Sequence, residues 1–216
     1  MNLNHRGIDF VFDAGPDTDF IGRQIRQNQA FFEQPLLDYI LKFFPKHATI
    51  LDIGANFGNH TLFFSRFLEH KQIVCFEPNL PTFELLRANV GDVALCKRIA
   101  LGDKECRANG TILEADNAGT FTLTEDPDGN IVVRPLDSYA FEDVTLMKID
   151  AECMELQVIK GGMQTITRCR PLIFAEGHGH GYMAPITELL EPLGYSLRNM
   201  SDVSPELGTT WMLLAR

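Results

Sequence analysis

Short apolar runs of strand length alternate with segments of helical periodicity along most of the chain. Runs such as "TILDI" and "VTLMKI" are apolar at nearly every position, which is typical of strands buried on both faces of a parallel sheet. Between these runs, apolar residues recur every three or four positions, as on one face of an amphipathic helix. The pattern therefore predicts an α/β fold, a mostly parallel sheet with helices on both faces. The predicted strands cover 49–53, 72–76, 92–96, 144–149 and 171–176, and the predicted helices cover 36–44, 62–68, 80–90, 156–166 and 185–193.

Two segments depart from this alternation. Residues 98–134 contain alternating runs on either side of Asp128-Gly129, which predicts a β-rich insertion with a hairpin at that dipeptide. The last two predicted strands, 194–199 and 209–216, follow one another without a helix between them. We therefore expect the sheet to close with an antiparallel hairpin.

The length of 216 residues suits one domain of ordinary size, and 45% apolar residues are enough for a core. Residues 1–30 are polar, and we expect a short extension with one strand. The predicted division is an extension over 1–32 and one domain over 33–216.

The charge and the cysteines limit the partners and the compartment. The chain has 29 Asp and Glu against 19 Lys and Arg, a formal net charge of −10. No Lys/Arg cluster interrupts this negative charge, so neither nucleic acid nor an anionic membrane is an expected partner. The five cysteines form no CxxC pair, and neither a signal peptide nor an apolar run of roughly 20 residues is found. We expect a cytoplasmic protein; its oligomeric state stays open, a homo-oligomer included.

The stretch "ILDIGANFGNH" (50–60) leads from a predicted strand into a predicted helix. Gly54 allows a tight turn, and Gly58 allows close approach of the backbone where the helix begins. In open α/β sheets, ligands bind beyond the carboxyl ends of the strands. The stretch therefore predicts a cofactor-binding turn, with candidate residues Asp52, Gly54, Ala55, Asn56, Gly58 and His60.

Glu77 ends the next predicted strand, where an acidic side chain can accept hydrogen bonds from both hydroxyls of a ribose. A nicotinamide dinucleotide prefers a glycine where this chain has Asn56, and Asp52 would repel its diphosphate. S-adenosylmethionine carries a ribose and an ammonium group but no phosphate, and the carboxylate of Asp52 suits that ammonium group. Asp52 and Glu77 therefore favour S-adenosylmethionine as the cofactor.

The segment "MKIDAECMELQVIKGG" (147–162) brings a cation and several carboxylates to the end of the fourth predicted strand. Lys148 and Asp150 share one face of that strand. A cation inside an apolar strand needs a partner, which is either Asp150 or a bound anion. Glu152 and Glu155 follow at the start of a helix, where negative charge also suits the helix dipole.

The segment "AEGHGHG" (175–181) closes the fifth predicted strand with Glu176 and continues with His178 among three glycines. An imidazole here could take a proton from a substrate hydroxyl. Glu176, His178 and His180 would also suit a metal on an extended segment, but the glycines favour a loop. We expect His178 to be a base, a substrate ligand or part of a solvated loop, and we expect no metal.

Taken in order, several motifs resemble the FkbM-type family of S-adenosylmethionine-dependent methyltransferases over about residues 33–215. They are "LDIGANFGNHTLFFS", "CFEPN", "ALGDKE", "RPLDSY", "MKIDAECMELQVIKGG" and "PLIFAEGH". The resemblance implies a Rossmann-like, class I methyltransferase fold with a seven-stranded sheet. It also implies O-methylation of a hydroxyl on a sugar, a polyketide or a related metabolite. In the cofactor site, the glycine turn would hold the methionine end and Glu77 the ribose, and Asn79, Ala100 and Leu101 would border the adenine. Pro78 is a further candidate for the cofactor site.

The chain departs from this family at one position of the "KIDxEGxE" element, where the family has Gly and this chain has Cys153. If that Gly has a positive φ, a Cys strains the turn. If the Gly only opens the helix, a Cys is tolerated.

In the resulting interpretation, the protein holds an acceptor oxygen in line with the sulfur–methyl bond. Asp150 or His178 is the expected base, and Lys148 would stabilise the oxyanion or tether the substrate. Two alternatives stay open, an NAD-dependent oxidoreductase on a similar sheet and a non-catalytic relative. The candidate residues for the small-molecule acceptor are Glu152, Glu155, Glu176 and Asn117.

Overall fold

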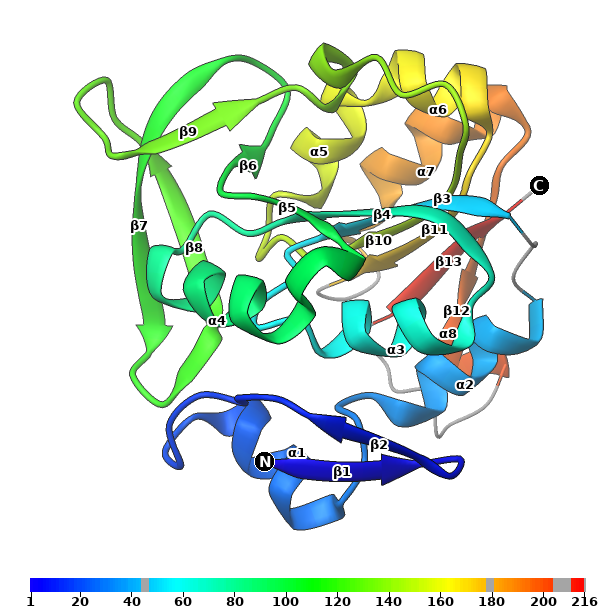
Figure 1. The fold of residues 1–216 in the computed structure, drawn as a ribbon. Coiled ribbons are helices and arrows are strands. Elements are labelled where there is room, and N and C mark those ends of the chain that lie inside the picture. Colours follow the sequence, from blue (N-terminus) through cyan, green and yellow to red (C-terminus); the bar gives the residue numbers. More distant parts are fainter. Residues whose placement is uncertain (44–46, 178–180, 204–210, 216) are drawn as a thin grey trace.

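The computed structural model describes residues 1–43, 47–177, 181–203 and 211–215, and its centre is a seven-stranded sheet (Figure 1). The strand order is β12-β13-β11-β10-β3-β4-β5. The strands from β11 to β5 are parallel, and β13 runs antiparallel to both of its neighbours. The predicted sheet and its closing antiparallel hairpin are confirmed, but the strand expected over 92–96 begins only at Leu95, because Gly91–Val93 forms a short 3-10 helix. The strands are β3 (Ala48–Ile53), β4 (His70–Phe76), β5 (Leu95–Lys97), β10 (Val144–Ile149), β11 (Leu172–Glu176), β12 (Ser196–Asn199) and β13 (Trp211–Ala215).

Helices cover both faces of this sheet, as predicted (Figure 1). Because neighbouring side chains of a strand point to opposite faces, Ile50 and Leu51 of β3 belong to two different hydrophobic cores. In the described ranges, no helix has the length and apolar character that crossing a bilayer requires. The first core lies under α2 (Gln34–Phe43), α3 (Asn59–Phe67) and α4 (Leu80–Val90), and the second under α5 (Glu155–Gly161), α6 (Met163–Cys169) and α7 (Ala184–Leu190). Shorter turns are η1 (Gly91–Val93), η2 (Leu136–Tyr139), η3 (Glu191–Leu193) and α8 (Met200–Val203).

The single helix expected over 156–166 is wrong, because the chain forms α5 and α6, which meet at Gly162. A Cβ on Gly161 would lie 1.9 Å from the carbonyl oxygen of Gly102, and a Cβ on Gly162 would lie 3.0 Å from the Leu136 side chain. The two glycines therefore let the chain bend against its neighbours. The apolar spacing continues across the bend, so periodicity alone does not reveal it.

The insertion forms its own four-stranded sheet, in the order β6-β9-β7-β8. Its β-rich character is confirmed, but the hairpin predicted at Asp128-Gly129 is wrong, because β8 and β9 do not pair and lie on opposite sides of β7. A Cβ on Gly129 would lie 2.3 Å from the Ala108 carbonyl oxygen, so this glycine serves a close crossing of β7. The hairpin joins β7 to β8. The strands are β6 (Ala100–Leu101), β7 (Cys106–Glu114), β8 (Asn117–Glu125) and β9 (Ile131–Arg134).

The N-terminal segment, residues 1–33, is more structured than the one strand expected. Strands β1 (Asn2–His5) and β2 (Ile8–Val11) pair antiparallel, and helix α1 spans Phe20–Asn28. Buried side chains such as Leu3 and Ile25 belong to the same core as α2, α3 and α4. Although the segment is polar overall, its few apolar residues therefore complete the core on that face of the sheet.

Candidate active site

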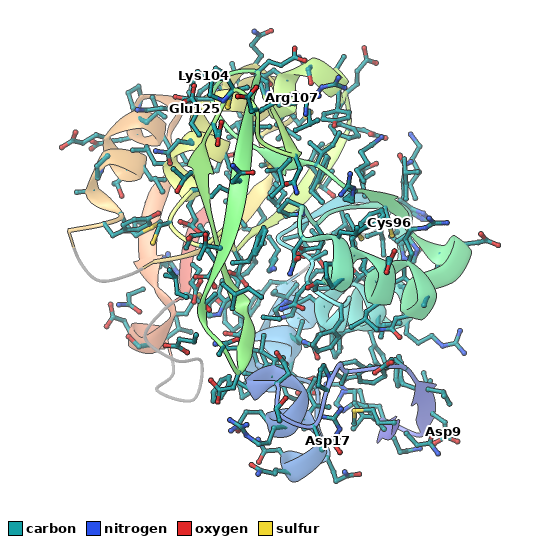
Figure 2. The ribbon with its side chains drawn as sticks, turned by 90° about the vertical axis from the view of Figure 1, so that its left-hand side faces the viewer. Asp9, Asp17, Cys96, Lys104, Arg107 and Glu125 are labelled. Atoms are coloured by element: carbon teal, nitrogen blue, oxygen red, sulfur yellow. The ribbon has the colours of Figure 1, made fainter. Side chains whose placement is uncertain are left out.

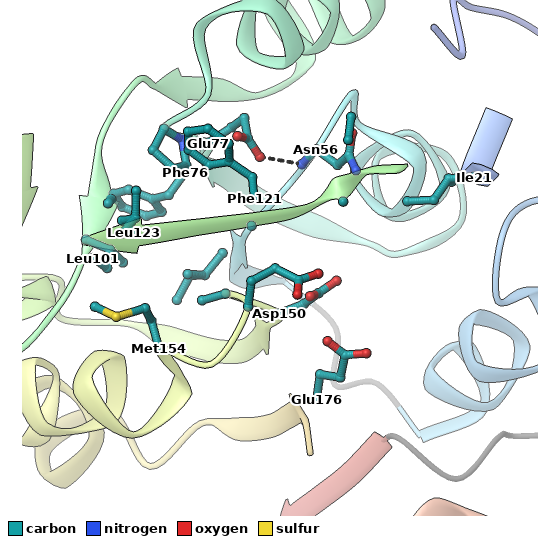
Figure 3. Close-up of a pocket in the computed structure, with 18 of the residues that line it drawn as sticks. Ile21, Asn56, Phe76, Glu77, Leu101, Phe121, Leu123, Asp150, Met154 and Glu176 are labelled. Carbon is teal, nitrogen blue, oxygen red and sulfur yellow. Dashed lines mark hydrogen bonds between the residues drawn. The ribbon is translucent and has the colours of Figure 1, made fainter. Parts of the chain in front are cut away.

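A pocket of about 320 Å³ lies beyond the carboxyl ends of β3, β4, β10 and β11 (Figure 3). The central sheet and its loops form one wall, and β8 with the N-terminal segment forms the other. Within the part of the chain that the structure describes, no Lys or Arg lines the pocket. Its carboxylates are Glu33, Glu77, Asp150, Glu152 and Glu176.

Strand β8 is the roof of the pocket, the wall that faces the central sheet, and α1 holds this strand in place. Asp19 caps α1 by accepting a hydrogen bond from the Gly22 N–H at 3.0 Å, and its other oxygen accepts from the Ala118 N–H of β8 at 2.9 Å. The Phe20 N–H donates to the Asp116 carbonyl at 2.6 Å. Figure 2 shows the β7–β8 hairpin extending down to the N-terminal segment. Two segments far apart in sequence thus close the pocket together.

The glycine turn after β3 has two glycines with different tasks. Gly54 has a φ of +72°, and a Cβ there would lie 1.6 Å from the Asp150 carbonyl oxygen, so it lets the turn touch the loop after β10. Gly58 has a φ of +98° and precedes α3. A Cβ on Gly58 would lie 3.0 Å from Leu86 and Val90, which shows that Gly58 serves the packing of α3 on α4.

Two backbone N–H groups hold the side chain of Glu77, which directly follows the carboxyl end of β4. Its Oε2 accepts from the Asn56 N–H at 2.9 Å (Figure 3), and its Oε1 accepts from the Asn79 N–H at 2.9 Å. Burial raises the pKa of Glu77 to about 7, although both N–H groups oppose that rise. Each oxygen keeps a second lone pair, so the carboxylate can still accept hydrogen bonds from a ligand in the pocket.

Lys148 lies under the glycine turn and not in the pocket. Its Nζ donates to the Gly54 carbonyl at 2.6 Å and to the Ile53 carbonyl at 3.4 Å, and it lies 3.3 Å from Asp52 Oδ1 and 3.4 Å from Asp150 Oδ2. Burial alone would lower the pKa of Lys148, but Asp150 and Asp52 outweigh it and hold that pKa above its ordinary value. The ammonium group therefore stays charged and joins the turn to Asp150.

Asp52 shares this buried position. Its side chain is 0% exposed, its Oδ2 accepts from the Thr61 hydroxyl at 2.6 Å, and Lys148 balances its charge. The carboxylate expected at the cofactor's ammonium group thus has protein partners and does not line the pocket.

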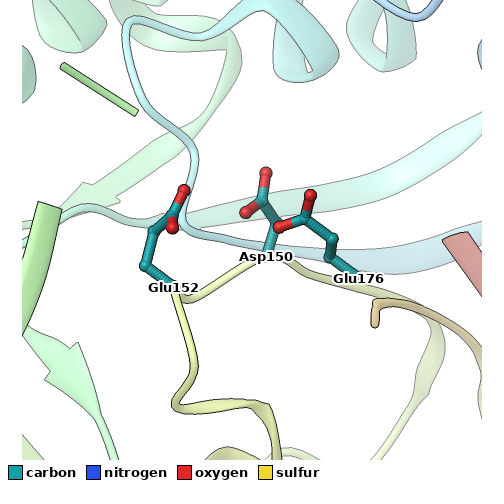
Figure 4. Close-up of side chains that lie close together, drawn as sticks. All are labelled: Asp150, Glu152 and Glu176. Carbon is teal, nitrogen blue, oxygen red and sulfur yellow. The ribbon is translucent and has the colours of Figure 1, made fainter. Parts of the chain in front are cut away.

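Three carboxylates gather on the floor of the pocket. Oxygens of Asp150, Glu152 and Glu176 lie within 4.8 Å of one another (Figure 4). Burial and then Asp150 raise the pKa of Glu176 to about 10, so Glu176 holds a proton at neutral pH. Burial, followed by Asp150 and Glu155, raises the pKa of Glu152 to about 7. Three such oxygens also suit a hard divalent cation, and the expectation of a metal-free site stays a prediction.

The turn that carries Glu152 is strained. The Met154 N–H donates to the Ala151 carbonyl at 3.1 Å, and the two residues between them have positive φ, +48° at Glu152 and +72° at Cys153. This is a turn of type I′, which favours Gly and Asn. Cys153 therefore occupies a position that suits the Gly of the family pattern.

Replacing Cys153 by Gly is expected to raise the free energy of unfolding by about 1 kcal/mol, because a left-handed non-glycine residue stores strain that exceeds the extra chain entropy of Gly. Urea denaturation of the purified protein measures this. Cys153→Ala keeps the Cβ and should gain nothing. Equal stability of the Gly and Ala variants would contradict the strain argument.

Glu155 supports this turn from below. It is 0% exposed, its Oε1 accepts from the Ala151 N–H at 2.8 Å, and the Tyr182 hydroxyl donates to its Oε2. It does not line the pocket. Glu155 is therefore neither a solvent-exposed charge at the start of the helix nor a residue that lines the pocket for a substrate.

The other candidate residues divide by place. His60 is 7% exposed, with its Nε2 3.3 Å from Glu33 Oε2, and His178 lies outside the described residues. The predicted residues that line the pocket are Gly54, Asn56, Glu77, Pro78, Ala100, Leu101, Asn117, Asp150, Glu152 and Glu176. Those that support it from behind are Asp52, Ala55, Gly58, His60, Asn79, Lys148 and Glu155.

Sequence reasoning missed the lining residues that come from the N-terminal segment and from the roof. Glu33 has a φ of +57°, and its carboxylate accepts from the Trp211 indole N–H. No periodicity marks Glu33, because it stands in the short connection between α1 and α2. Phe121 and Leu123 of β8 could have been proposed from their alternation with polar residues, which gives the strand one apolar face. The missed residues are Phe20, Ile21, Phe32, Glu33, Ala118, Gly119, Phe121 and Leu123.

The sheet order with one reversed strand, and a pocket between a glycine turn and an acidic residue at the next strand end, define the class of Rossmann-like, class I methyltransferases. The chain belongs to the FkbM methyltransferase family: the family profile "Methyltransferase FkbM domain" matches residues 52–197.

A curated relative and two solved structures are similar to the chain. The 2-O-methyltransferase NoeI of Sinorhizobium fredii (strain NBRC 101917 / NGR234) is 28% identical over 145 residues, which cover 56% of this chain and 60% of that protein. The methyltransferase FkbM from Methylobacillus flagellatus KT has a TM-score of 0.55 at 14% identity, covering 93% of this chain and 55% of that one. A putative rRNA-methylase from Clostridium thermocellum has a TM-score of 0.51 at 11% identity, covering 86% and 93%. At these identities the two structures show a shared fold and do not specify an acceptor.

Proposed function

We propose that the protein uses S-adenosylmethionine to methylate a hydroxyl oxygen of a small metabolite, such as a sugar or polyketide-type acceptor. One observation carries this proposal: a single pocket holds a ribose-type carboxylate, Glu77, and a half-buried group of carboxylates that includes Asp150. The first suits a nucleoside cofactor, and the second suits removal of a proton from an acceptor.

The residues present fit this cofactor. Glu77 is fixed by two backbone N–H groups at the strand end where a ribose is bound in such sheets. Leu101, Phe121 and Leu123 supply an apolar wall of the kind that an adenine ring needs. A nicotinamide dinucleotide would bring a diphosphate, and among the described lining residues no Lys or Arg stands ready to meet it. The lining thus supports S-adenosylmethionine over the dinucleotide.

The chemistry assigned to this chain is proton removal and orientation, since the bound cofactor supplies an activated methyl group. Asp150 lines the pocket and is the proposed base that takes the hydroxyl proton of the acceptor onto its carboxylate. Glu176 holds a proton beside it and forms a side-chain hydrogen bond with Asp150. Lys148, which does not line the pocket, keeps Asp150 and the Gly54 carbonyl in place.

The acceptor atom is proposed to be oxygen, because the relative from Sinorhizobium fredii is a 2-O-methyltransferase. The chain spans 60% of that relative's length, so its particular substrate is not carried over. A small acceptor is supported by the roof of β8 and α1 over the pocket. The formal net charge of −10 argues against a nucleic acid acceptor.

Calorimetric titration with S-adenosylhomocysteine is the first test, and we expect micromolar binding to the wild-type protein. Glu77→Ala should weaken that binding at least about tenfold, because the carboxyl group that accepts hydrogen bonds from the ribose hydroxyls is lost. A thermal melt confirms that the variant is folded. Tight binding of NAD without binding of S-adenosylhomocysteine would support an oxidoreductase instead. If neither ligand binds, the glycine turn after β3 only connects a strand to a helix and holds no cofactor.

A further inference from the structure

The ammonium group of the proposed cofactor needs a carboxylate as its partner. Asp52 is the candidate that stands next to the glycine turn, but it is fully buried and paired with Lys148 and Thr61. A ligand in the pocket cannot reach it without breaking that pair. The partner of the ammonium group must therefore come from the pocket lining.

Glu33 is presented to the pocket by contacts from two other elements. Its Oε1 accepts from the Trp211 indole N–H of β13, and its Oε2 lies 3.3 Å from His60 Nε2 of α3. The Asn59 side chain, one residue before His60, accepts from the Phe32 N–H and donates to the Phe32 carbonyl, both at 3.0 Å. The first residues of α3 thus hold this part of the N-terminal segment next to the glycine turn.

Glu33 is also close to the buried charges of the site. The pKa of Glu176 is raised by burial, by Asp150 and Glu152, and also by Glu33. Burial lowers the pKa of Lys148, and Glu33 adds to Asp150 and Asp52 in raising it. Its carboxylate therefore acts on the same end of the pocket as the loop after β10.

The other lining carboxylates have competing tasks. Glu77 is bound by two backbone N–H groups at the end of β4 and is assigned to the ribose. Asp150 faces Lys148 and shares the floor of the pocket with Glu152 and Glu176. Glu33 alone among the described lining carboxylates comes from the N-terminal segment, outside this group and outside the ribose site.

We propose that Glu33 binds the ammonium group of the cofactor's amino-acid tail, with Trp211 and His60 fixing its carboxylate. This inference rests on the proposed function, because it assigns a residue to the same cofactor. It makes the N-terminal segment a part of the cofactor site. Glu33 is then a binding residue, and His60 and Trp211 are positioning residues that act through it.

The test compares two ligands on three proteins. S-adenosylhomocysteine carries the amino-acid tail, and 5′-methylthioadenosine keeps the adenine, the ribose and the sulfur but lacks that tail. Both are titrated calorimetrically into the wild type, into Glu33→Gln and into Glu84→Gln. Glu84 is exposed on α4 and outside the pocket, so its variant makes the same change of charge without touching the site.

We expect Glu33→Gln to weaken S-adenosylhomocysteine binding about tenfold or more, and to leave 5′-methylthioadenosine binding within about twofold of the wild type. Unchanged 5′-methylthioadenosine binding also shows that the variant is folded. Equal weakening of both ligands would assign Glu33 to the shape of the pocket and overturn the inference. Unchanged binding of both would overturn it as well. Failure of the wild type to bind either ligand would instead overturn the proposed function.

Discussion

Replacing Lys148 by Met is expected to lower the free energy of unfolding by about 3–5 kcal/mol and to abolish methyl transfer, since removal of one partner leaves buried charge uncompensated. The Lys148 side chain is 3% exposed and that of Asp52 is 0% exposed, so water cannot replace the lost ammonium group. The Gly54 and Ile53 carbonyls would lose their donor at the same time. Urea denaturation at neutral pH measures the change.

Two further variants separate this effect from the loss of any lysine. Lys71 pairs with Asp143, but its side chain is 68% exposed, and Lys71→Met should change stability by at most about 1 kcal/mol. In the double variant Lys148→Met/Asp52→Asn the buried negative charge is gone as well, and part of the stability should return. If Lys148→Met behaves like Lys71→Met in stability yet loses turnover, Lys148 acts on the acceptor directly, as an oxyanion or substrate ligand would.

The centre of the sheet could be predicted from the sequence because its inner strands β3, β10 and β11 are buried on both faces. Strands of that kind are solid apolar runs, and "VTLMKI" became β10 without change of its bounds. The insertion could not be predicted at the same level. The Asp128-Gly129 turn signal is local, whereas β9 pairs with β7, from which β8 separates it in sequence. Pairing between strands that are not neighbours in sequence depends on tertiary contacts.

Much of the candidate site follows from one rule, that ligands bind at the carboxyl ends of parallel strands. Glu77, Asp150 and Glu176 end or directly follow such strands, and all three line the pocket. The rule does not tell which side chains point into the pocket. Lys148 and Asp52 are paired in register on β10 and β3, and that register places both under the turn.

The contribution of the N-terminal segment could not be predicted, because nothing in a short connection marks its place in space. Glu33 reaches the pocket through hydrogen bonds made by residues of α3 and β13. These partners lie close to it only after the sheet has formed. Asp19 is a similar case. An Asp before a helix is a common N-cap, but its hydrogen bond to the Ala118 N–H of β8 depends on the tertiary fold.

The variant Asp150→Asn is expected to slow methyl transfer by about 10²–10⁴-fold, the usual contribution of a general base. Binding of S-adenosylhomocysteine should stay within about threefold of the wild type, because the ribose and ammonium carboxylates are untouched. Glu176 cannot replace the base, since at neutral pH it already holds its proton. Single-turnover transfer to an identified acceptor, with calorimetry beside it, separates the two effects. Undiminished turnover would transfer the role of base to another group, His178 being the candidate from the sequence.

The same variant should be less sensitive to alkaline pH in its stability. The pKa of Glu176 is raised from 4.5 to about 10, by burial first and by Asp150 next. A carboxyl with a raised folded pKa stabilises the fold fully below its unfolded pKa, and that contribution is lost as the pH rises toward the folded value. Wild-type stability should therefore fall between about pH 5 and pH 10, by up to about 1.4 kcal/mol per pH unit for one proton.

In Asp150→Asn the pKa of Glu176 lies lower, so the fall is smaller, whereas Asp92→Asn on the exposed η1 turn should keep the wild-type slope. A variant that loses activity but gains stability at high pH would show that the carboxylates are held together for function at a cost to the fold. An unchanged slope would show that Asp150 does not raise the pKa of Glu176.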